Sequence, residues 1–575
     1  MLLSPKVVPP TSLKKLFYAA TLLFLLGTFV FCLFYFCSDY ETLKNWYFSI
    51  GPCFYKQETW ASDFFAPDVK AKGNYLVLFG CVLCISGIIY IIWAWRKLEA
   101  KKAAILPFGR CRLLGWYVGV IILAVLMGMS SFYRSAPSSD ELFSAVNCAM
   151  APAFRCISYY MLPNNHMYFN LLNHILFGWS DDLVLTGRLI SFAAYIGVLL
   201  CAFYWFCSLF KKEWLAFIAL FPVALQFLVW GFATQARGYE CQLLCGWVSF
   251  ISMMFYVRTN SRGALFLNTC SNIAGIALVP TFIYMLPAQV LFICGIMVAK
   301  RSILWQYFKY QVIFCVFTFL LYLPGFCFSG VAAFTANSYV RPAPGVFHTF
   351  LVAFLDYSRP AVKYTFSLLS AKDSTISFVL FLFPALLCFS KQPERRLVGF
   401  FYITYWVVLI LFTFQMRRLP FFRNMITEYS LAMACIVYTF YTVSDTIANR
   451  FKHGSLQFAS RLLWIVPLLF SCVFLFTSDR ENVSSDLYFS NGDEVFKTFK
   501  TEFNTIPRGS SIGFPRDNFY FYYLGRTMHF KVSECAVGNE EYYIHPAPEP
   551  LPANIPEQYT FIRKFAADYE LFKRK

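Results

Sequence analysis

The chain has 575 residues, of which 58% are hydrophobic, 20% aromatic and only 14% charged, and its mean hydropathy is +0.55. A soluble protein has too little interior to bury that much apolar surface, and the same figures exclude disordered, fibrous and small disulfide-rich proteins. The net charge of +18 would favour a nucleic-acid partner in a soluble protein. In a membrane protein, lysines and arginines instead mark the loops on the cytoplasmic side. We therefore expect a polytopic membrane protein whose surroundings are lipids and which binds no nucleic acid.

About thirteen apolar runs are long enough to cross a bilayer, which takes roughly 20 residues per helix. They begin near residues 16, 74, 113, 183, 214, 240, 264, 283, 309, 376, 397, 428 and 461. Lysines and arginines gather in alternate loops, and the positive-inside rule places those loops in the cytoplasm. The N-terminus is then cytoplasmic and the C-terminus extracytoplasmic, and the expected fold is all-α within the membrane.

Three segments are expected along the chain. Residues 1–112 form an N-terminal extension of two spans, residues 113–478 form the main transmembrane domain, and residues 479–575 form a small extracytoplasmic domain of mixed α/β structure. The long outer connections lie at about 39–73, 132–182 and 329–375. The sequence contains no phosphate-binding glycine loop, so neither ATP hydrolysis nor a nucleotide sugar at a cytosolic site is expected.

The outer loop after the third span contains an acidic pair at the start of an amphipathic helix. Asp140 and Glu141 follow two serines and precede Leu142 and Phe143, a pattern typical of a helix start with acids in its first turn. One interpretation is that the two acids only cap this helix. The other is that a carboxylate at the membrane rim acts as a base or a metal ligand.

The segments around this pair resemble those of the GT-C glycosyltransferases, in particular the branch that contains the protein O-mannosyltransferases and the lipid A aminoarabinose transferase. The matching segments are Asp140-Glu141, Asn165-His166-Met167, Phe177-Gly178, Arg188-Leu189-Ile190-Ser191, Arg237-Gly238-Tyr239 and the basic stretch from Arg417 to Arg423. Met167 departs from the pattern, because the family has a proline there. The resemblance covers roughly residues 113–478, which makes this segment a GT-C-like catalytic domain.

The resemblance implies an enzyme that moves a sugar from a polyprenyl-phosphate donor to a glycan, lipid A or protein acceptor on the extracytoplasmic face, in a bacterial inner membrane. The acceptor hydroxyl is a weak nucleophile and needs a carboxylate to accept its proton. By resemblance Asp140 is this base. Glu141 would orient an arginine or the acceptor, or share a divalent metal ion, and no other cofactor is implied.

The leaving lipid phosphate is an anion and requires positive charge around it. The candidate phosphate ligands on the outer rim are Arg134, Arg237, Arg417, Arg418 and Arg423. Contact with lipid head groups is the alternative interpretation of these arginines. The candidate substrate contacts are His166, Tyr239, Glu240 and Lys363.

Two further patterns in the outer loop have local interpretations. His166 and His174 are eight residues apart and can share a helix face, either as structural residues or as metal ligands. Asp181 and Asp182 are expected to cap the helix that enters the fourth span.

Two other functions compete with the transferase. A lipid-linked glycan flippase or transporter would be expected to show inverted repeats with paired broken helices, and no such repeat is evident. An O-antigen ligase or polymerase also uses outward arginines, but it would be expected to have a longer central outer loop rich in His and Arg.

Overall fold

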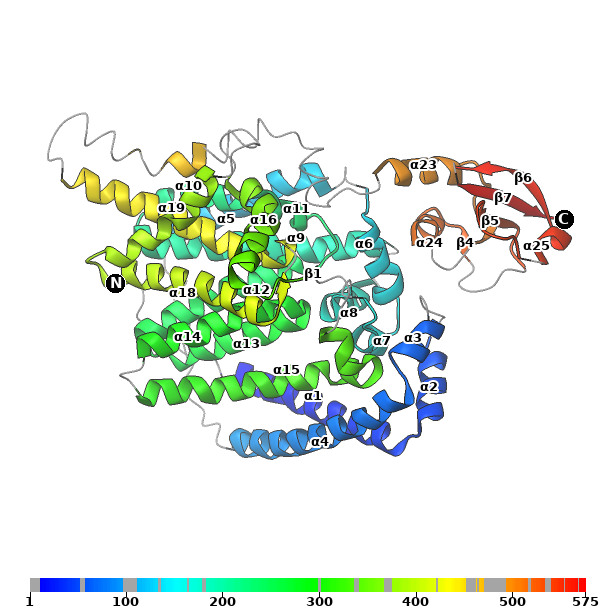
Figure 1. Cartoon of the computed structure of the whole chain (residues 1–575), viewed down its shortest axis with the longest axis horizontal. Coiled ribbons are helices and arrows are strands. Elements are labelled where there is room, and N and C mark those ends of the chain that lie inside the picture. Colours follow the sequence, from blue (N-terminus) through cyan, green and yellow to red (C-terminus); the bar gives the residue numbers. More distant parts are fainter. Residues whose placement is uncertain are drawn as a thin grey trace.

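The computed structural model describes residues 11–51, 57–96, 111–132, 136–162, 165–177, 182–297, 301–335, 341–366, 375–419, 422–450, 462, 465–469, 493–514, 519–532 and 539–575, apart from Ala553 and Ala567. Within these residues the chain is a bundle of long apolar helices followed by a small domain with a sheet (Figure 1). The expectation of an all-α membrane protein with a small mixed α/β C-terminal domain is confirmed.

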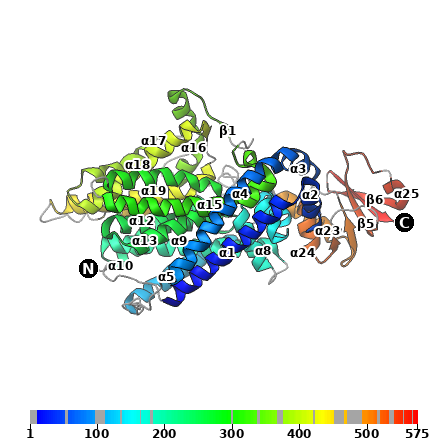
Figure 2. The ribbon, with the colours of Figure 1, turned by 90° about the horizontal axis from the view of Figure 1, so that it is seen from below.

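The N-terminal extension is a helical hairpin. It contains α1 (Thr11–Cys37), α2 (Tyr40–Ser49), α3 (Gln57–Asp63) and α4 (Pro67–Arg96). Glycines allow close packing here, since a Cβ on Gly73 of α4 would lie 2.3 Å from the Tyr35 hydroxyl of α1. A Cβ on Gly80 would lie 2.8 Å from Leu323, which belongs to a later helix of the bundle. Figure 2 shows the two long helices α1 and α4 running together across the bundle.

The main bundle begins with α5 (Cys111–Phe132) and continues beyond a set of short outer helices. The outer helices are α6 (Ser139–Phe143), the π-helix η1 (Ser144–Ala149), α7 (Ala153–Ser158) and α8 (Met167–Phe177). The next helices are α9 (Leu183–Phe210), α10 (Glu213–Ala224), α11 (Phe227–Ala233), α12 (Tyr239–Thr259), α13 (Arg262–Leu278), η2 (Pro280–Tyr284) and α14 (Met285–Met297). The bundle is completed by α15 (Arg301–Thr335), α16 (Phe347–Phe366), α17 (Thr375–Leu382), η3 (Phe383–Phe389), α18 (Pro393–Gln415), η4 (Phe422–Met425) and α19 (Ile426–Ala448).

Eight of the described helices are long and apolar enough to cross a membrane, and three more are shorter apolar helices. Each apolar run predicted from the sequence coincides with a described helix except the last, near residue 461, which lies almost wholly outside the described residues. The chain is therefore an integral, multi-pass membrane protein, while the number of about thirteen crossings stays a prediction.

The direction of the helices separates the two ends of the bundle. The helices α9, α12 and α19 run from the end that carries α6 to the opposite end, and there they lead into the basic positions Lys211, Arg258 and Arg450. The helix α18 runs the other way, and the basic Lys391 precedes its start. All these basic positions therefore lie at one end, and the short outer helices lie at the other.

The C-terminal domain pairs two helices with a five-stranded sheet. Its elements are α23 (Asp493–Phe503), β3 (Ser511–Gly513), α24 (Phe519–Thr527), β4 (Lys531–Val532), β5 (Tyr542–Pro546), α25 (Asn554–Gln558), β6 (Tyr559–Phe565) and β7 (Tyr569–Arg574). The strand order is β4-β3-β5-β7-β6, with β3 parallel to both neighbours and the other pairs antiparallel. An aromatic core that includes Phe503, Phe521 and Phe565 holds α23 and α24 on this sheet. The predicted boundary at residue 479 falls outside the described residues.

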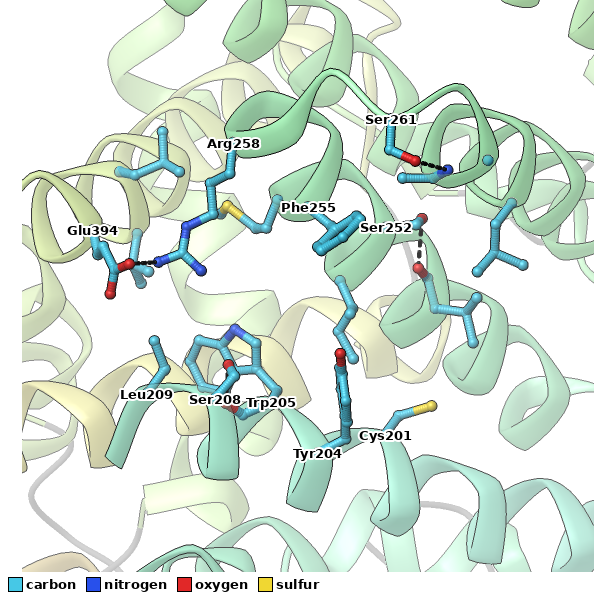
Figure 3. Close-up of a pocket in the computed structure, with 18 of the residues that line it drawn as sticks. Cys201, Tyr204, Trp205, Ser208, Leu209, Ser252, Phe255, Arg258, Ser261 and Glu394 are labelled. Carbon is cyan, nitrogen blue, oxygen red and sulfur yellow. Dashed lines mark hydrogen bonds and ion pairs between the residues drawn. The ribbon is translucent and has the colours of Figure 1, made fainter. Parts of the chain in front are cut away.

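Two further features of the bundle bear on function. A short antiparallel pair, β1 (Arg341–Pro342) with β2 (Arg418–Leu419), joins the loop after α15 to the loop after α18. An apolar cavity with a volume of about 780 Å³ lies between α9, α12, α13 and α18, in the half of the bundle nearer the basic loops (Figure 3).

Candidate active site

The helix α6 starts with a reciprocal pair of hydrogen bonds. The Glu141 N–H donates to Ser138 Oγ at 3.3 Å, and the Ser138 N–H donates to Glu141 Oε2 at 2.8 Å. This capping box satisfies donors that a helix N-terminus otherwise leaves unpaired. Glu141 therefore takes part in capping α6, as the helix-cap interpretation expects.

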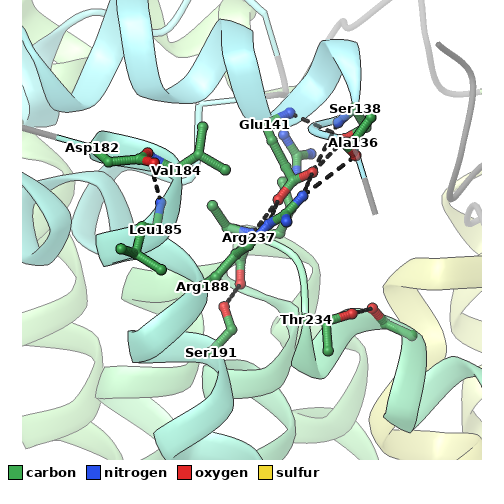
Figure 4. Close-up of polar contacts among 12 residues, drawn as sticks. Ala136, Ser138, Glu141, Asp182, Val184, Leu185, Arg188, Ser191, Thr234 and Arg237 are labelled. Atoms are coloured by element: carbon green, nitrogen blue, oxygen red, sulfur yellow. Dashed lines mark hydrogen bonds and ion pairs between the residues drawn. The ribbon is translucent and has the colours of Figure 1, made fainter. Parts of the chain in front are cut away.

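Glu141 is also the centre of a buried polar cluster (Figure 4). Its carboxylate is 1% exposed and accepts two hydrogen bonds from Arg188, Nε to Oε1 at 2.9 Å and Nη2 to Oε2 at 3.1 Å. The Ala236 N–H donates to the same Oε1 at 2.7 Å. Burial alone would raise the pKa of the Glu141 carboxyl, but the Arg188 guanidinium and these hydrogen bonds hold it below its usual value. Glu141 is thus ionised and ties α6 to α9 and to the segment before α12.

Asp140 has a different environment from its neighbour. Its side chain is 31% exposed and lies between two arginines, with Arg423 Nη1 3.0 Å and Arg237 Nη2 3.7 Å from Oδ2. Arg237 also donates from Nη1 to the Asp140 carbonyl oxygen at 3.1 Å and to Ser144 Oγ at 3.0 Å. The structure therefore brings three sequence-predicted residues together, from α6, from the segment before α12 and from η4.

His166 and Tyr239 line the buried side of this arginine pair. The rings of His166 and Tyr239 meet edge to face at 4.8 Å, and the guanidinium carbons of Arg237 and Arg423 lie 5.6 and 5.9 Å from the centre of the Tyr239 ring. The Gly238 N–H donates to His166 Nδ1 at 2.9 Å, which puts the proton of a neutral imidazole on Nε2. Burial and then the two arginines hold the pKa of His166 well below its usual value, so the ring is neutral.

The charges of this cluster do not cancel. Glu141 and Arg188 neutralise each other, whereas Asp140 contributes one negative charge against the two positive charges of Arg237 and Arg423. Since His166 is neutral, these residues carry one more positive charge than negative. A partly exposed carboxylate beside surplus guanidinium charge can accept a proton from a hydroxyl and bind an anionic oxygen group next to it.

The other predicted phosphate ligands have different positions. Arg417 is exposed in the turn after α18 and has a backbone φ of 50°, and Arg418 is half-buried on β2. Arg134 lies outside the described residues. The phosphate role of these three arginines stays a prediction.

Glu240 and Lys363 are the remaining candidate substrate contacts. Glu240 is completely buried at the start of α12, and neither of its carboxylate oxygens has a hydrogen-bond partner among the described residues. Contact between Glu240 and a substrate stays a prediction that this burial does not favour. Lys363 belongs to α16, and its side chain lies outside the described part.

The two histidines of the outer loop do not converge. His174 Nδ1 lies 2.9 Å from the Ala149 carbonyl oxygen, whereas His166 faces Gly238 and Arg237. Within the described ranges, no three His, Cys, Asp or Glu side chains gather as a metal site would require. A divalent ion stays a prediction for which this part of the chain offers no ligand set.

The C-terminal domain reaches the same region through α24. The Tyr523 hydroxyl donates to both carboxylate oxygens of Asp182 at 3.2 Å, and Asp182 caps α9 through the N–H groups of Val184 and Leu185. The expected capping role is confirmed for Asp182, whereas Asp181 lies outside the described residues. Phe519 meets Phe143 of α6 edge to face at 5.3 Å, so α24 packs on the helix that carries the acidic pair.

Sequence reasoning missed Arg188 as a partner of Glu141. Arg188 belongs to one of the motifs that carried the resemblance, but 47 residues separate it from Glu141, and no local pattern connects the two. The buried position of Glu141 in an apolar neighbourhood was the available signal, since a buried carboxylate needs a cationic partner.

No family model and no curated protein matches this sequence. Among solved structures, the chain is similar to ArnT from Cupriavidus metallidurans, both bound to undecaprenyl phosphate and in the apo state. The identity is 10% in each case, the match covers 80% of this chain and 98% of ArnT, and the TM-scores are 0.44 and 0.45. It is also similar to the arabinosyltransferase EmbB from Mycobacterium smegmatis, with 12% identity over 72% of this chain and 42% of EmbB and a TM-score of 0.35.

Proposed function

We propose that this protein is a membrane glycosyltransferase that moves a sugar from a polyprenyl-phosphate donor to an acceptor hydroxyl on the extracytoplasmic face of a bacterial inner membrane. The observation that carries the proposal is the position of Asp140, which is 31% exposed and 3.0 Å from Arg423 at the end of the bundle opposite the basic loops. In this position, the Asp140 carboxylate can accept a proton, and the adjacent Arg423 guanidinium group can bind a phosphate.

Asp140 is the general base of the proposed reaction. The carboxylate takes the proton of the acceptor hydroxyl as the oxygen attacks the anomeric carbon of the sugar, and the bond from that carbon to the phosphate oxygen breaks. The Arg423 guanidinium, which Asp140 orients, interacts with the departing lipid phosphate and stabilises its charge. Arg237 holds the backbone of α6 through the Asp140 carbonyl oxygen and adds to the positive field.

The membrane setting suits a lipid-linked donor. The acidic pair lies on short outer helices directly beside spans α9 and α12, so a phosphate at the membrane surface can meet Arg423 while its isoprenoid chain stays among the helices. The acceptor class of glycan, lipid A or protein is left open in this proposal, as is the sugar.

The test compares cells without the gene with cells that carry the wild-type gene or Arg423→Gln. Mass spectrometry of surface glycans and lipid A is expected to show one sugar modification that only the wild type restores fully. Purified protein in nanodiscs is then given undecaprenyl phosphate, the lipid bound in one similar solved structure. We expect Arg423→Gln to weaken binding by about 10- to 100-fold, because a charged hydrogen bond contributes about 1.5–3 kcal/mol.

Arg563→Gln is the matched control, since Arg563 lies on β6 of the C-terminal domain and pairs with Glu502 there. Unchanged surface glycans and lipid A in cells without the gene would contradict the proposed transferase. Equal binding of undecaprenyl phosphate by wild type and Arg423→Gln would remove Arg423 from the phosphate site.

A further inference from the structure

The apolar cavity in the other half of the bundle is separate from the proposed active site. Its wall on α9 extends from Leu200 to Leu209, whereas Arg188 marks the active-site end of the same helix. The 16 residues from Arg188 to Tyr204 correspond to about 24 Å along a helix at about 1.5 Å per residue. A ligand in this cavity therefore does not touch Asp140 or its arginines.

The cavity opens toward the surrounding lipid. Among its lining residues, Tyr204 of α9 and Phe266 and Leu267 of α13 are large apolar side chains that are at least 40% exposed. The volume of about 780 Å³ is within the range of small-molecule sites, roughly 300–1,000 Å³. Since most of the lining is apolar, water gains few hydrogen bonds there, and an acyl chain is the better occupant.

The mouth of the cavity carries one positive and one negative side chain. Arg258, in the last turn of α12, forms an ion pair with Glu394, in the first turn of α18 (Figure 3). The two side chains are 26% and 54% exposed, so both can reach a further partner at the membrane surface. Ser208 of α9 and Ser261, the N-cap of α13, also line the cavity and add hydroxyl groups to it.

We propose that this cavity binds a phospholipid of the surrounding bilayer whose head group carries both a phosphate and a primary ammonium group. Its acyl chain fills the apolar part between α9, α12 and α18. Its phosphate binds Arg258, and its ammonium group donates hydrogen bonds to Glu394. The paired charges of the mouth match the paired charges of such a head group, whereas an anionic lipid or a polyprenyl phosphate has no cationic group that could pair with Glu394.

The lipid has a structural consequence for the bundle. With its chain in place, it fills the space between α9 and the helices α12 and α18, and its head group bridges the last turn of α12 to the first turn of α18. The basic loops at this end place the site in the cytoplasmic leaflet, opposite the proposed catalysis.

The test is native mass spectrometry of the full-length protein, purified and depleted of lipid. Dioleoyl phosphatidylethanolamine, phosphatidylcholine and phosphatidylglycerol are titrated separately, with undecaprenyl phosphate as a fourth ligand. We expect one phosphatidylethanolamine molecule to bind about tenfold more tightly than the other three ligands, because among the four only its primary ammonium group is a positively charged donor of hydrogen bonds to Glu394.

Three variants locate the lipid. Cys201→Trp places an indole in the cavity and is expected to weaken phosphatidylethanolamine binding by about tenfold or more. Glu394→Gln is expected to abolish the preference for ethanolamine over choline, and Arg258→Gln to weaken binding of all three phospholipids. Lys391→Gln is the control, because Lys391 is exposed at the same end and does not line the cavity.

The exchange Arg258→Glu with Glu394→Arg tests whether the pair of charges at the mouth is what the lipid recognises. It restores an ion pair between α12 and α18 and keeps one positive and one negative side chain there, so thermal stability and the ethanolamine preference are both expected to recover relative to the two single variants. Equal binding of phosphatidylglycerol, phosphatidylcholine or undecaprenyl phosphate would overturn the proposal. So would unchanged lipid binding in Cys201→Trp, or the absence of any bound lipid.

Discussion

Asp140 and Glu141 are adjacent in sequence but occupy opposite environments. Glu141 is 1% exposed and bound by Arg188, whereas Asp140 is 31% exposed between Arg237 and Arg423. Successive residues of a helix point in directions about 100° apart, so one turn can direct one carboxylate into the protein and the other toward its surface. In the proposed mechanism, Asp140 therefore has the chemical role and Glu141 the supporting role.

Breaking the Glu141–Arg188 pair is expected to destabilise the protein. Glu141→Gln leaves the Arg188 guanidinium without its buried counter-charge, and loss of one partner of a buried pair costs about 3–5 kcal/mol. The thermal unfolding temperature of purified protein is expected to fall clearly. Asp68→Asn is the control, because Asp68 pairs with Lys72 on the exposed surface. Equal unfolding temperatures for Glu141→Gln and Asp68→Asn would show that the buried pair contributes little.

His166 is expected to make stability depend on pH. Its pKa in the folded protein lies well below the usual value of about 6.5, because burial and the two neighbouring arginines oppose its protonation. As the pH falls through about 6.5, His166 becomes protonated in the unfolded chain but stays neutral in the folded protein, so stability is lost as the pH falls. Unfolding temperatures measured from pH 7.5 to pH 5.5 are expected to decrease less in His166→Gln than in the wild type. The exposed His348 provides the control variant His348→Gln, and identical pH profiles for His166→Gln and the wild type would be inconsistent with a neutral buried imidazole.

At the scale of elements, α24 of the C-terminal domain supports α6. Phe519 and Tyr523 belong to one aromatic face that packs against Leu142, Phe143 and Val184. Because α6 is only five residues long, it cannot hold its own position by helical hydrogen bonding, and packing must supply the constraint. The C-terminal domain is therefore part of the framework of the proposed active site.

Tyr523→Phe tests this support while it keeps the aromatic ring. The variant removes two hydrogen bonds to Asp182, and a typical buried hydrogen bond contributes about 0.5–1.5 kcal/mol. We expect faster amide hydrogen exchange in α6 and at the start of α9, measured by mass spectrometry. Tyr522→Phe removes a hydroxyl from the same helix and serves as the comparison. If α6 exchanges equally in both variants, the contact of Tyr523 with Asp182 does not support the acidic helix.

The elements show which parts of the site could be predicted from sequence. The start of α6 was visible because Ser138 and the two acids form a local pattern, and Asp182 was recognised as a cap for the same reason. The contacts of Asp140 with Arg423 and of Glu141 with Arg188 span 283 and 47 residues. Such contacts depend on how distant helices pack, and the spacing of residues along the chain does not encode that packing.

At the scale of the whole molecule, the basic loops lie at one end of the helix bundle and the proposed active site lies at the other. The proposed active site, the short outer helices and the C-terminal domain lie at one end (Figure 1). The basic positions that follow α9, α12 and α19 lie at the other end. Periodicity and charge alternation were sufficient to predict this polarity, because both follow directly from the requirements of a bilayer.

We expect the basic end to lie in the cytoplasm, and cysteine labelling tests this orientation. A single cysteine introduced at the exposed Glu557 of α25 is expected to react with a membrane-impermeant maleimide in intact spheroplasts. One introduced at the exposed Lys211 is expected to react only after the membrane is permeabilised. Both would be placed in a background in which labelling of the native cysteines has been measured. The reverse pattern would place the proposed active site in the cytoplasm and contradict a donor used on the extracytoplasmic face.

The most direct test of the central claim is the turnover of Asp140→Asn. This change preserves the size of the side chain and removes the proton acceptor, so sugar transfer by purified protein is expected to fall by roughly 10²–10⁴-fold. The binding of undecaprenyl phosphate and the unfolding temperature are expected to stay close to the wild-type values, and Asp68→Asn should retain full activity. A wild-type rate of transfer by Asp140→Asn would contradict the account and leave the acidic pair as a helix cap alone.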